Sequence, residues 1–260
     1  MCLLVVVFQV HPDAPLVVAA NRDEFLARPA TAMAVLSEKD PRILGGRDAL
    51  AGGTWLALNE RGVFAGLTNV PGARDPSKRS RGELPLILAR RRSAQEAVAA
   101  FEECVSPADF SPAWLFAGDR SDLYFIDLAS GGARAGVTRL SPGLYVLENA
   151  PLFSPSRKVD LVITALKNIE SARGEAVVAR LADVLRSHDI PEPASTPASA
   201  SAFVRPAETY APCVHAGPYG TRSSLIALIG ENAASPLRLL SSDGPPCSAP
   251  YIDATHLWAP

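Results

Sequence analysis

Cys2 is the residue of this sequence whose type and position most directly allow chemistry. It stands between Met1 and the apolar run 3–8, where a buried strand has no use for a thiol. A methionine before a small residue is normally removed, which would leave Cys2 at the chain terminus. Its α-amine, with an ordinary pKa of about 7.7–8.0, would then lie beside a thiol of about 8.5. One residue would supply both a nucleophile and its general base, unless a cysteine occurs here by chance.

Four polar residues in the stretch AANRDEF follow the next apolar run. In extended chain, Asn21 and Asp23 would turn to one side, and Arg22 and Glu24 to the other. A carboxylate can hold a terminal amine, and a guanidinium can lower the pKa of a thiol or bind a substrate carboxylate. The alternative interpretation is a solvated loop after a strand.

Three further polar residues stand at the ends of expected strands. Asn69 and Asn149 each stand at the end of one such strand, where a side-chain amide can donate to an oxyanion. The alternative is an ordinary asparagine in a turn. Arg222 precedes an apolar strand, where it would be either an anion clamp or a surface charge. The basic residues Lys78, Arg79, Arg81 and 90–92 are expected to be solvated, with binding of an anionic ligand as the weaker alternative.

Cysteine and histidine are dispersed along the chain, and no CxxC pair occurs. They are Cys2, Cys104, Cys213, Cys247, His11, His188, His215 and His256. This spacing predicts neither a metal site nor a disulfide framework. Free thiols suit a reducing compartment, so a cytoplasmic protein is expected.

Charge and hydropathy exclude two broad classes of protein. The net charge of −2 and the pI near 6.1 argue against a nucleic-acid binder. The apolar run 3–8 is too short to cross a membrane and lacks the basic start of a signal peptide, so no integral membrane protein is expected.

The elements that must position these residues alternate in blocks of strands and helices. Strands are expected at 3–10, 16–20, 55–58, 63–68, 114–116, 123–127, 135–139 and 144–147, and again at 219–230 and 236–244. Helices are expected at 83–92, 94–104, 159–170 and 175–188, with Ser93 as an N-cap. The proline-rich stretch 190–212 is either a plain connector or a flap over a pocket. This order predicts a layered α+β fold with two sheets covered by helices, as one domain over 1–260.

Taken together, the motifs resemble the NRDE family, the transport and Golgi organisation 2 family. The matching stretches are Met1-Cys2, Asn21-Arg22-Asp23-Glu24, Gly52-Gly53-Thr54-Trp55, Thr68-Asn69, Ser80-Arg81-Gly82, Asn149 and Tyr219-Gly220-Thr221-Arg222-Ser223-Ser224. They keep the family's order from residue 1 to about 230. That family is in turn similar to the N-terminal nucleophile (Ntn) hydrolases, whose cysteine branch includes bile-salt hydrolases, penicillin acylases and acyltransferases.

The resemblance implies a four-layer αββα sandwich of the Ntn-hydrolase type and a set of catalytic residues. Cys2 would be the nucleophile after removal of Met1, with Arg22 and Asp23 beside it. Asn69 and Asn149 would position the oxyanion and the amine, and Arg222 would complete the site.

Three more residues are expected to bind substrate. They are Asn21, Trp55 and Glu148. Glu148 departs from the family pattern, which has a small hydroxyl residue at this position, and it could bring an unexpected carboxylate to the site.

Two classes of function remain open at this stage. The first is a cysteine hydrolase or acyltransferase that acts on a small acyl amide or thioester and needs no cofactor. The second is a non-catalytic carrier or chaperone that holds haem or another hydrophobic anion, such as an acyl lipid, in the same pocket. Fold resemblance alone does not choose between them.

Overall fold

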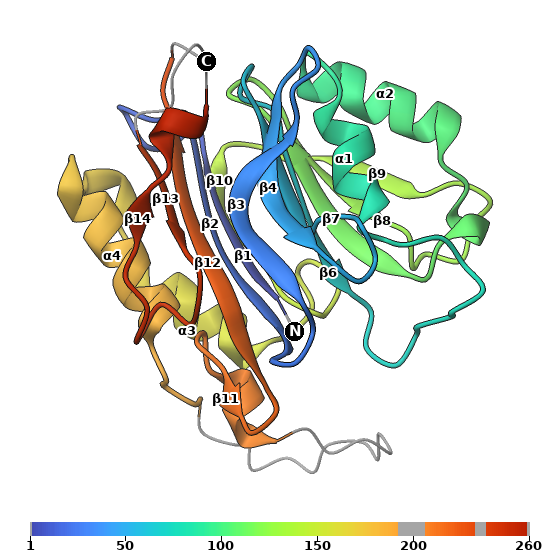
Figure 1. Ribbon diagram of the computed structural model, residues 1–260. Helices are drawn as coiled ribbons and strands as arrows, with labels where there is room; N and C mark the ends of the chain where they lie inside the picture. The colour runs from blue at the N-terminus through green and yellow to red at the C-terminus, as the bar shows by residue number, and fades with distance from the viewer. Residues whose placement is uncertain (1, 192–205, 232–237, 259–260) are drawn as a thin grey trace.

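The computed structural model describes residues 2–191, 206–231 and 238–258, and its strands form two antiparallel sheets (Figure 1). The first sheet runs in the order β10 (Gly143–Leu147), β1 (Leu3–Phe8), β2 (Leu16–Phe25), β12 (Tyr219–Ile229), β13 (Arg238–Ser242) and β14 (Ile252–Asp253), with β11 (His215–Ala216) paired to β12. The second runs in the order β3 (Ala30–Ser37), β4 (Ile43–Asp48), β5 (Leu56–Asn59), β6 (Phe64–Asn69), β7 (Ala113–Gly118), β8 (Leu123–Asp127) and β9 (Gly136–Arg139). The expected fold class is therefore confirmed.

Helices cover the outer face of each sheet, which completes the four layers (Figure 1). Helices α3 (Arg157–Ala165) and α4 (Glu175–Arg186) pack on the first sheet, and α1 (Glu83–Ala89) and α2 (Ala94–Cys104) pack on the second. Short 3₁₀ turns occupy Pro107–Asp109, Ile169–Ser171, Ala207–Tyr210 and Thr255–Leu257. None of the helices in the described ranges has the length and hydrophobicity that crossing a bilayer requires.

Strand β1 is buried along its whole length because both faces of its sheet are covered. Leu4, Val6 and Phe8 pack between the two sheets, whereas the alternate side chains Leu3 and Val5 pack under α3 and α4. This explains why the opening run is apolar without alternation. Its neighbours β10 and β2 make β1 an interior strand.

The largest difference from the expected elements is in β2. The strand was expected to end at Ala20, yet it continues to Phe25 and so contains all four polar residues of the AANRDEF stretch. Pairing with β12 sustains it, for example between Asn21 and Ser224 and between Asp23 and Thr221. A solvated loop is therefore the wrong interpretation of this stretch.

Other boundaries shift by a few residues. The third helix was expected to reach residue 170 but ends at Ala165, shortly before Asn168 adopts a left-handed conformation. Strands β3 and β4 were not assigned individually from the sequence. Ser93 is the N-cap of α2, as expected, and its hydroxyl accepts from the Glu96 N–H. Most of the proline-rich stretch 190–212 lies outside the described residues.

Two glycine-containing motifs meet before β5. The Thr54 N–H donates to the Gly82 carbonyl at 2.9 Å, and a Cβ added to Gly53 would lie 2.5 Å from the Gly82 carbonyl carbon. Only glycine at position 53 permits this close approach. The contact fixes the segment before Trp55 against the start of α1.

Gly53→Ala should therefore destabilise the protein by about 1–3 kcal/mol, because the added methyl group forces two backbones apart. Urea unfolding would measure the loss. Gly136→Ala is the matched control, since its Cβ would meet only ordinary contacts of 3.7–3.9 Å on an exposed strand. Equal stability of the two variants would contradict the close approach.

Candidate functional site

Cys2 borders a cavity at the edge of the interface between the two sheets. By alternation its side chain shares the inter-sheet face with Leu4, and it is only 7% exposed. The cavity has a volume of about 480 Å³. Its walls come from the end of β2, the segment before β5 and the segment that leads into α1.

Two asparagines fix the nitrogen of Cys2. The Cys2 main-chain N–H donates to Asn149 Oδ1 at 2.8 Å, and Asn149 Nδ2 donates to the Asn69 carbonyl oxygen at 2.5 Å. Asn149 is thus held at both ends of its amide. Asn69 itself borders the cavity.

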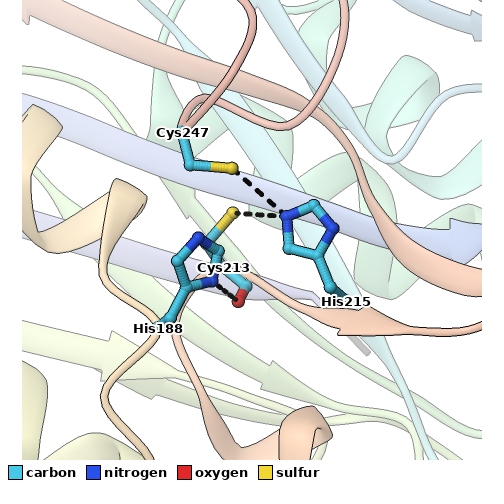
Figure 2. Close-up of side chains that lie close together, drawn as sticks. All are labelled: His188, Cys213, His215 and Cys247. Atoms are coloured by element: carbon cyan, nitrogen blue, oxygen red, sulfur yellow. Dashed lines mark hydrogen bonds between the residues drawn. The ribbon is translucent and has the colours of Figure 1, made fainter.

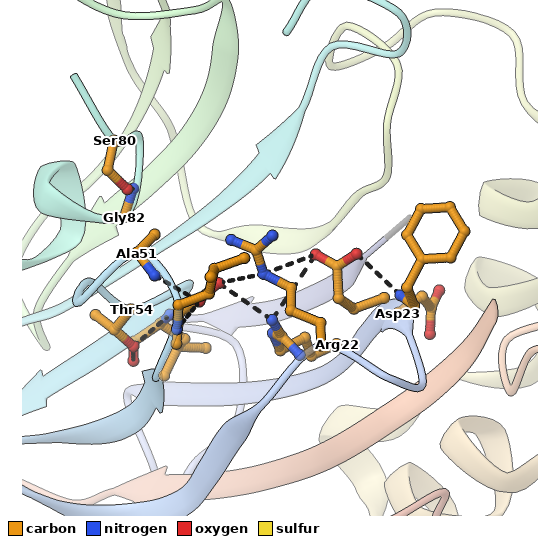
Figure 3. Close-up of polar contacts among 12 residues, drawn as sticks. Arg22, Asp23, Ala51, Thr54, Ser80 and Gly82 are labelled. Atoms are coloured by element: carbon orange, nitrogen blue, oxygen red, sulfur yellow. Dashed lines mark hydrogen bonds and ion pairs between the residues drawn. The ribbon is translucent and has the colours of Figure 1, made fainter. Parts of the chain in front are cut away.

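Arg22 extends from β2 toward the second sheet (Figure 3). Its guanidinium carbon lies 4.4 Å from the centre of the Trp55 ring, and its Nη2 lies 3.4 Å from Asp48 Oδ2 and 3.8 Å from Glu24 Oε2. Arg28 Nε donates to the same Asp48 oxygen at 2.7 Å. Burial lowers the pKa of Arg22, while both carboxylates oppose this shift. The guanidinium is therefore a fixed positive charge beside the cavity.

Asp23 turns toward the helices on the other face of its sheet. Its Oδ1 accepts from Thr221 Oγ1 at 2.6 Å, and its Oδ2 lies 3.8 Å from Lys158 Nζ. The side chains of Asp23 and Lys158 are both 0% exposed. Burial raises the pKa of Asp23, and the Lys158 charge lowers it. A buried carboxylate thus depends on the lysine that α3 presents to it.

Burial also raises the pKa of the Cys2 thiol, and the Asp23 carboxylate adds to this rise. The Asp23 main-chain N–H and the Arg22 charge act in the opposite direction because they stabilise a thiolate. The thiol is therefore protonated at neutral pH in this arrangement. A nearby base is needed to activate it.

Asn21 does not reach the cavity, although it was expected to bind substrate. Its side chain lies on the helix-covered face, where Nδ2 donates to the Leu185 carbonyl at 2.8 Å and to the Pro212 carbonyl at 2.9 Å. Both protons of the Asn21 side-chain amide are thus donated to main-chain carbonyls. Asn21 ties β2 to the end of α4 and to the segment before β11.

Glu148 and Arg222 are likewise absent from the cavity wall in the described chain. The Glu148 carboxylate accepts from the hydroxyl of Ser156, the N-cap of α3, and is buried there. Arg222 is the extra residue of a bulge in β12, between the positions that pair with Asp23 and Arg22. The structure therefore brings Cys2, Arg22, Asp23, Trp55, Asn69 and Asn149 together, and leaves Asn21, Glu148 and Arg222 outside the cavity.

Sequence reasoning assigned no role to Lys158 or Thr221. Lys158 ends the stretch SPSRK near the start of α3, and only its position after Asn149 could have indicated a role. Lys78, Arg79 and Arg81 were expected to be solvated, with binding of an anionic ligand as the alternative, and all three border the cavity. With Arg22, Arg28 and Arg74 they make six basic residues at the cavity, against the acidic residues Glu24, Asp48 and Asp75. Asp23 also borders the cavity, but its carboxylate faces the helices.

The sequence is similar to one set of known proteins, and the fold is similar to another. The sequence model of the family described as Transport and Golgi organisation 2 matches residues 1–236. The Transport and Golgi organization protein 2 homolog of Bos taurus is 32% identical over 252 residues, which cover 88% of this chain and 88% of that protein. The homolog of Mus musculus is 30% identical over 251 residues, which cover 89% and 90%.

Among solved structures, the fold is similar to two hydrolases. A mutant conjugated bile acid hydrolase from Clostridium perfringens superposes with a TM-score of 0.53 and 11% identity, over 98% of this chain and 93% of that one. The Caenorhabditis elegans ortholog of N-acylethanolamine-hydrolyzing acid amidase gives a TM-score of 0.51 and 15% identity, over 69% and 85%. The αββα sandwich is thus of the Ntn-hydrolase type, and identities this low establish the fold alone.

Lys158→Met should destabilise the protein by about 3–5 kcal/mol at neutral pH, because it leaves the Asp23 carboxylate buried without its cation. The pKa of Asp23, already raised by burial, would rise further. A raised carboxyl pKa opposes folding above that pKa, so the deficit should shrink as the pH falls through it. Chemical denaturation across the acidic range would follow this change.

Adding Asp23→Asn to Lys158→Met should restore much of the lost stability. Lys167→Met, at an exposed lysine just after α3, is the matched control and should unfold like the wild type. A deficit for Lys158→Met that is constant with pH would mean that Lys158 acts through packing rather than charge.

Proposed function

This chain belongs to the Transport and Golgi organisation 2 family, and from that premise we propose that it is a cysteine Ntn hydrolase or acyltransferase acting on an amide or thioester bond. The observation that carries the proposal is the bond from the nitrogen of Cys2 to Asn149 Oδ1. It holds this nitrogen at the cavity, within the same residue as the thiol. Met1 lies outside the described residues, and its removal would convert the nitrogen to a free α-amine.

The proposed reaction uses this amine as the general base. The amine takes the thiol proton, and the sulfur attacks the carbonyl carbon of the substrate. Asn69 supplies a side-chain donor for the oxyanion that develops. The protonated amine then gives its proton to the leaving nitrogen or sulfur, which leaves an acyl thioester on Cys2. Water, or a second nucleophile in a transferase, resolves this intermediate.

Residues of β2 adjust the thiol for this step. The Asp23 main-chain N–H and the Arg22 guanidinium both lower the cost of a thiolate that burial disfavours. Thr221 and Lys158 hold the Asp23 carboxylate away from the sulfur side of the strand. Arg22 itself is held by Trp55 and Asp48. The thiolate therefore forms in a site whose charges are already in place.

Charge at the cavity indicates the class of substrate. Basic side chains outnumber acidic ones along the wall, and burial lowers the pKa of one of them, Arg81, in the segment that leads into α1. A substrate with an anionic group beside its scissile carbonyl would be attracted to this wall. The two fold neighbours are named as an N-acylethanolamine-hydrolyzing acid amidase and a conjugated bile acid hydrolase, which supports an acyl amide as the substrate type.

A non-catalytic carrier of haem or another hydrophobic anion is the second candidate. The specific observation in its favour is the raised pKa of the buried Cys2 thiol, which leaves a neutral, unreactive sulfur when Met1 is retained. The same basic wall would then hold a carboxylate of the cargo. All four cysteines are free, so we place either activity in a reducing compartment, the cytoplasm.

Full-length protein with Met1 removed, verified by intact mass, should hydrolyse members of a panel of N-acyl amino acids and acyl thioesters. Cys2→Ala should abolish turnover without altering the melting temperature. Cys104→Ala, at the exposed end of α2, is the matched control and should keep full activity. Equal turnover by protein that retains Met1 would refute the amine as base, and haem binding without any turnover would favour the carrier.

Asn69 and Asn149 should affect different kinetic quantities. Asn69→Ala should lower kcat by about 10²–10³-fold with little change in KM, because it removes an oxyanion donor. Asn149→Ala should instead shift the acidic limb of the pH–rate profile, because it removes the acceptor that holds the amine. An effect of Asn69→Ala confined to KM would reassign it to substrate binding.

A further inference from the structure

Four side chains with metal-binding atoms from three separate stretches of the sequence converge in the described chain (Figure 2). They are His188, Cys213, His215 and Cys247, and one ligand atom of each lies within 4.8 Å of those of the other three. His188 follows α4, and Cys247 lies between β13 and β14. Cys213 shortly precedes β11, and His215 is the first residue of that strand. The expectation that cysteine and histidine are merely dispersed is therefore wrong for these four.

The distances in this cluster suit a tetrahedral ion. His215 Nε2 lies 3.2 Å from Cys247 Sγ and 3.9 Å from Cys213 Sγ. Nitrogen and sulfur ligands at about 2.0–2.3 Å from Zn²⁺ are separated by about 3.3–3.8 Å in a tetrahedron. Cys213 and His215 are two residues apart, and the contact between Cys213 Sγ and His215 Nε2 shows that their side chains meet.

The orientation of His188 matches that of a metal ligand. Its Nδ1 lies 3.1 Å from the Cys213 carbonyl oxygen, to which it donates when protonated there. Histidines that bind metals commonly donate their second ring N–H to a main-chain carbonyl, which fixes the tautomer and the ring plane. The other ring nitrogen then faces the two sulfurs and His215, as Figure 2 shows.

We propose that His188, Cys213, His215 and Cys247 form a structural Zn²⁺ site. Two thiolates and two imidazoles are the ligand set of closed, four-coordinate zinc sites, and a full set of protein ligands leaves no position for substrate. Zn²⁺ displaces the protons of both thiols as it binds. None of its ligands takes part in the Cys2 chemistry proposed above.

Main-chain contacts hold the ligand segments together before any metal binds. The Cys213 N–H donates to the Ser187 carbonyl at 2.9 Å, and Arg186 Nε donates to the Pro246 carbonyl at 3.0 Å. The first bond joins Cys213 to the residue before His188, and the second joins Arg186, two residues before His188, to the residue before Cys247. The metal therefore meets a preformed site and adds a cross-link between three segments of the chain.

This cross-link would also stabilise β2 beside Cys2, through contacts on the face of the sheet that the helices cover. The Val214 N–H, between two of the ligands, donates to Thr221 Oγ1 at 2.9 Å, and that hydroxyl donates to Asp23 Oδ1. Asn21 in turn donates to the Pro212 carbonyl. Zinc would thus fix the segment that contains Pro212 and Val214, and this segment holds the Thr221 hydroxyl that donates to Asp23.

Metal binding tests the proposal directly on the reduced, full-length protein. Titration with Zn²⁺ against a chromophoric chelator should give one ion per chain, and Co²⁺ in its place should give thiolate-to-metal charge-transfer bands and intense tetrahedral ligand-field bands. Zn²⁺ should also raise the melting temperature. The exposed ligand variants Cys247→Ser and His188→Ala should fold yet lose stoichiometric binding, the cobalt spectrum and the thermal shift.

Cys104→Ser and His256→Ala are the matched controls, since both residues are exposed and lie outside the cluster. Each should bind one ion like the wild type. Three results would overturn the proposal: no stoichiometric binding by reduced wild-type protein, binding that survives in both ligand variants, or a Cys213–Cys247 disulfide that persists in reductant and leaves only two titratable thiols.

Discussion

The pairing of β2 with β12 is the constraint on which the rest of the site depends. It extends β2 beyond its apolar half, so that polar residues that alone would favour a loop are held in extended chain. Alternation then separates their roles, because Arg22 faces the second sheet while Asn21 and Asp23 face the helices. The bulge at Arg222 realigns the two strands beside Asp23. Strand β1, paired to the other side of β2, brings Cys2 to the same end.

Buried charge determines much of what surrounds this strand. An isolated carboxylate or guanidinium inside a sandwich is costly, so each charged residue of β2 brings partners from another layer. Asp23 has Lys158 from α3 and Thr221 from β12, and Arg22 has Asp48 and Trp55 from the second sheet. The charges thus connect three of the four layers at the point where the thiol lies. Chemistry and packing share the same residues here.

Much of the fold could be predicted because its signals are local. Apolar runs, an N-cap at Ser93 and the block order of strands and helices indicated two covered sheets. That Cys2, Arg22 and Asp23 lie close together followed from motifs that match those of the NRDE family in order. The partners of these residues could not be predicted, since Lys158 and Thr221 reach Asp23 only through tertiary packing. The same holds for His188 and Cys247, which are separated by 58 intervening residues and meet only because α4 and the β13–β14 connection lie side by side.

The contact between Gly53 and Gly82 couples two short motifs that the sequence presents as separate. Neither position can gain a side chain while the other backbone stays where it is. The segment before Trp55 and the segment containing Arg81 border the same cavity from opposite sides of this contact. A lineage that altered the cavity wall by moving one segment would have to move the other with it. The two motifs therefore form a single structural unit, in which a change of one requires a change of the other.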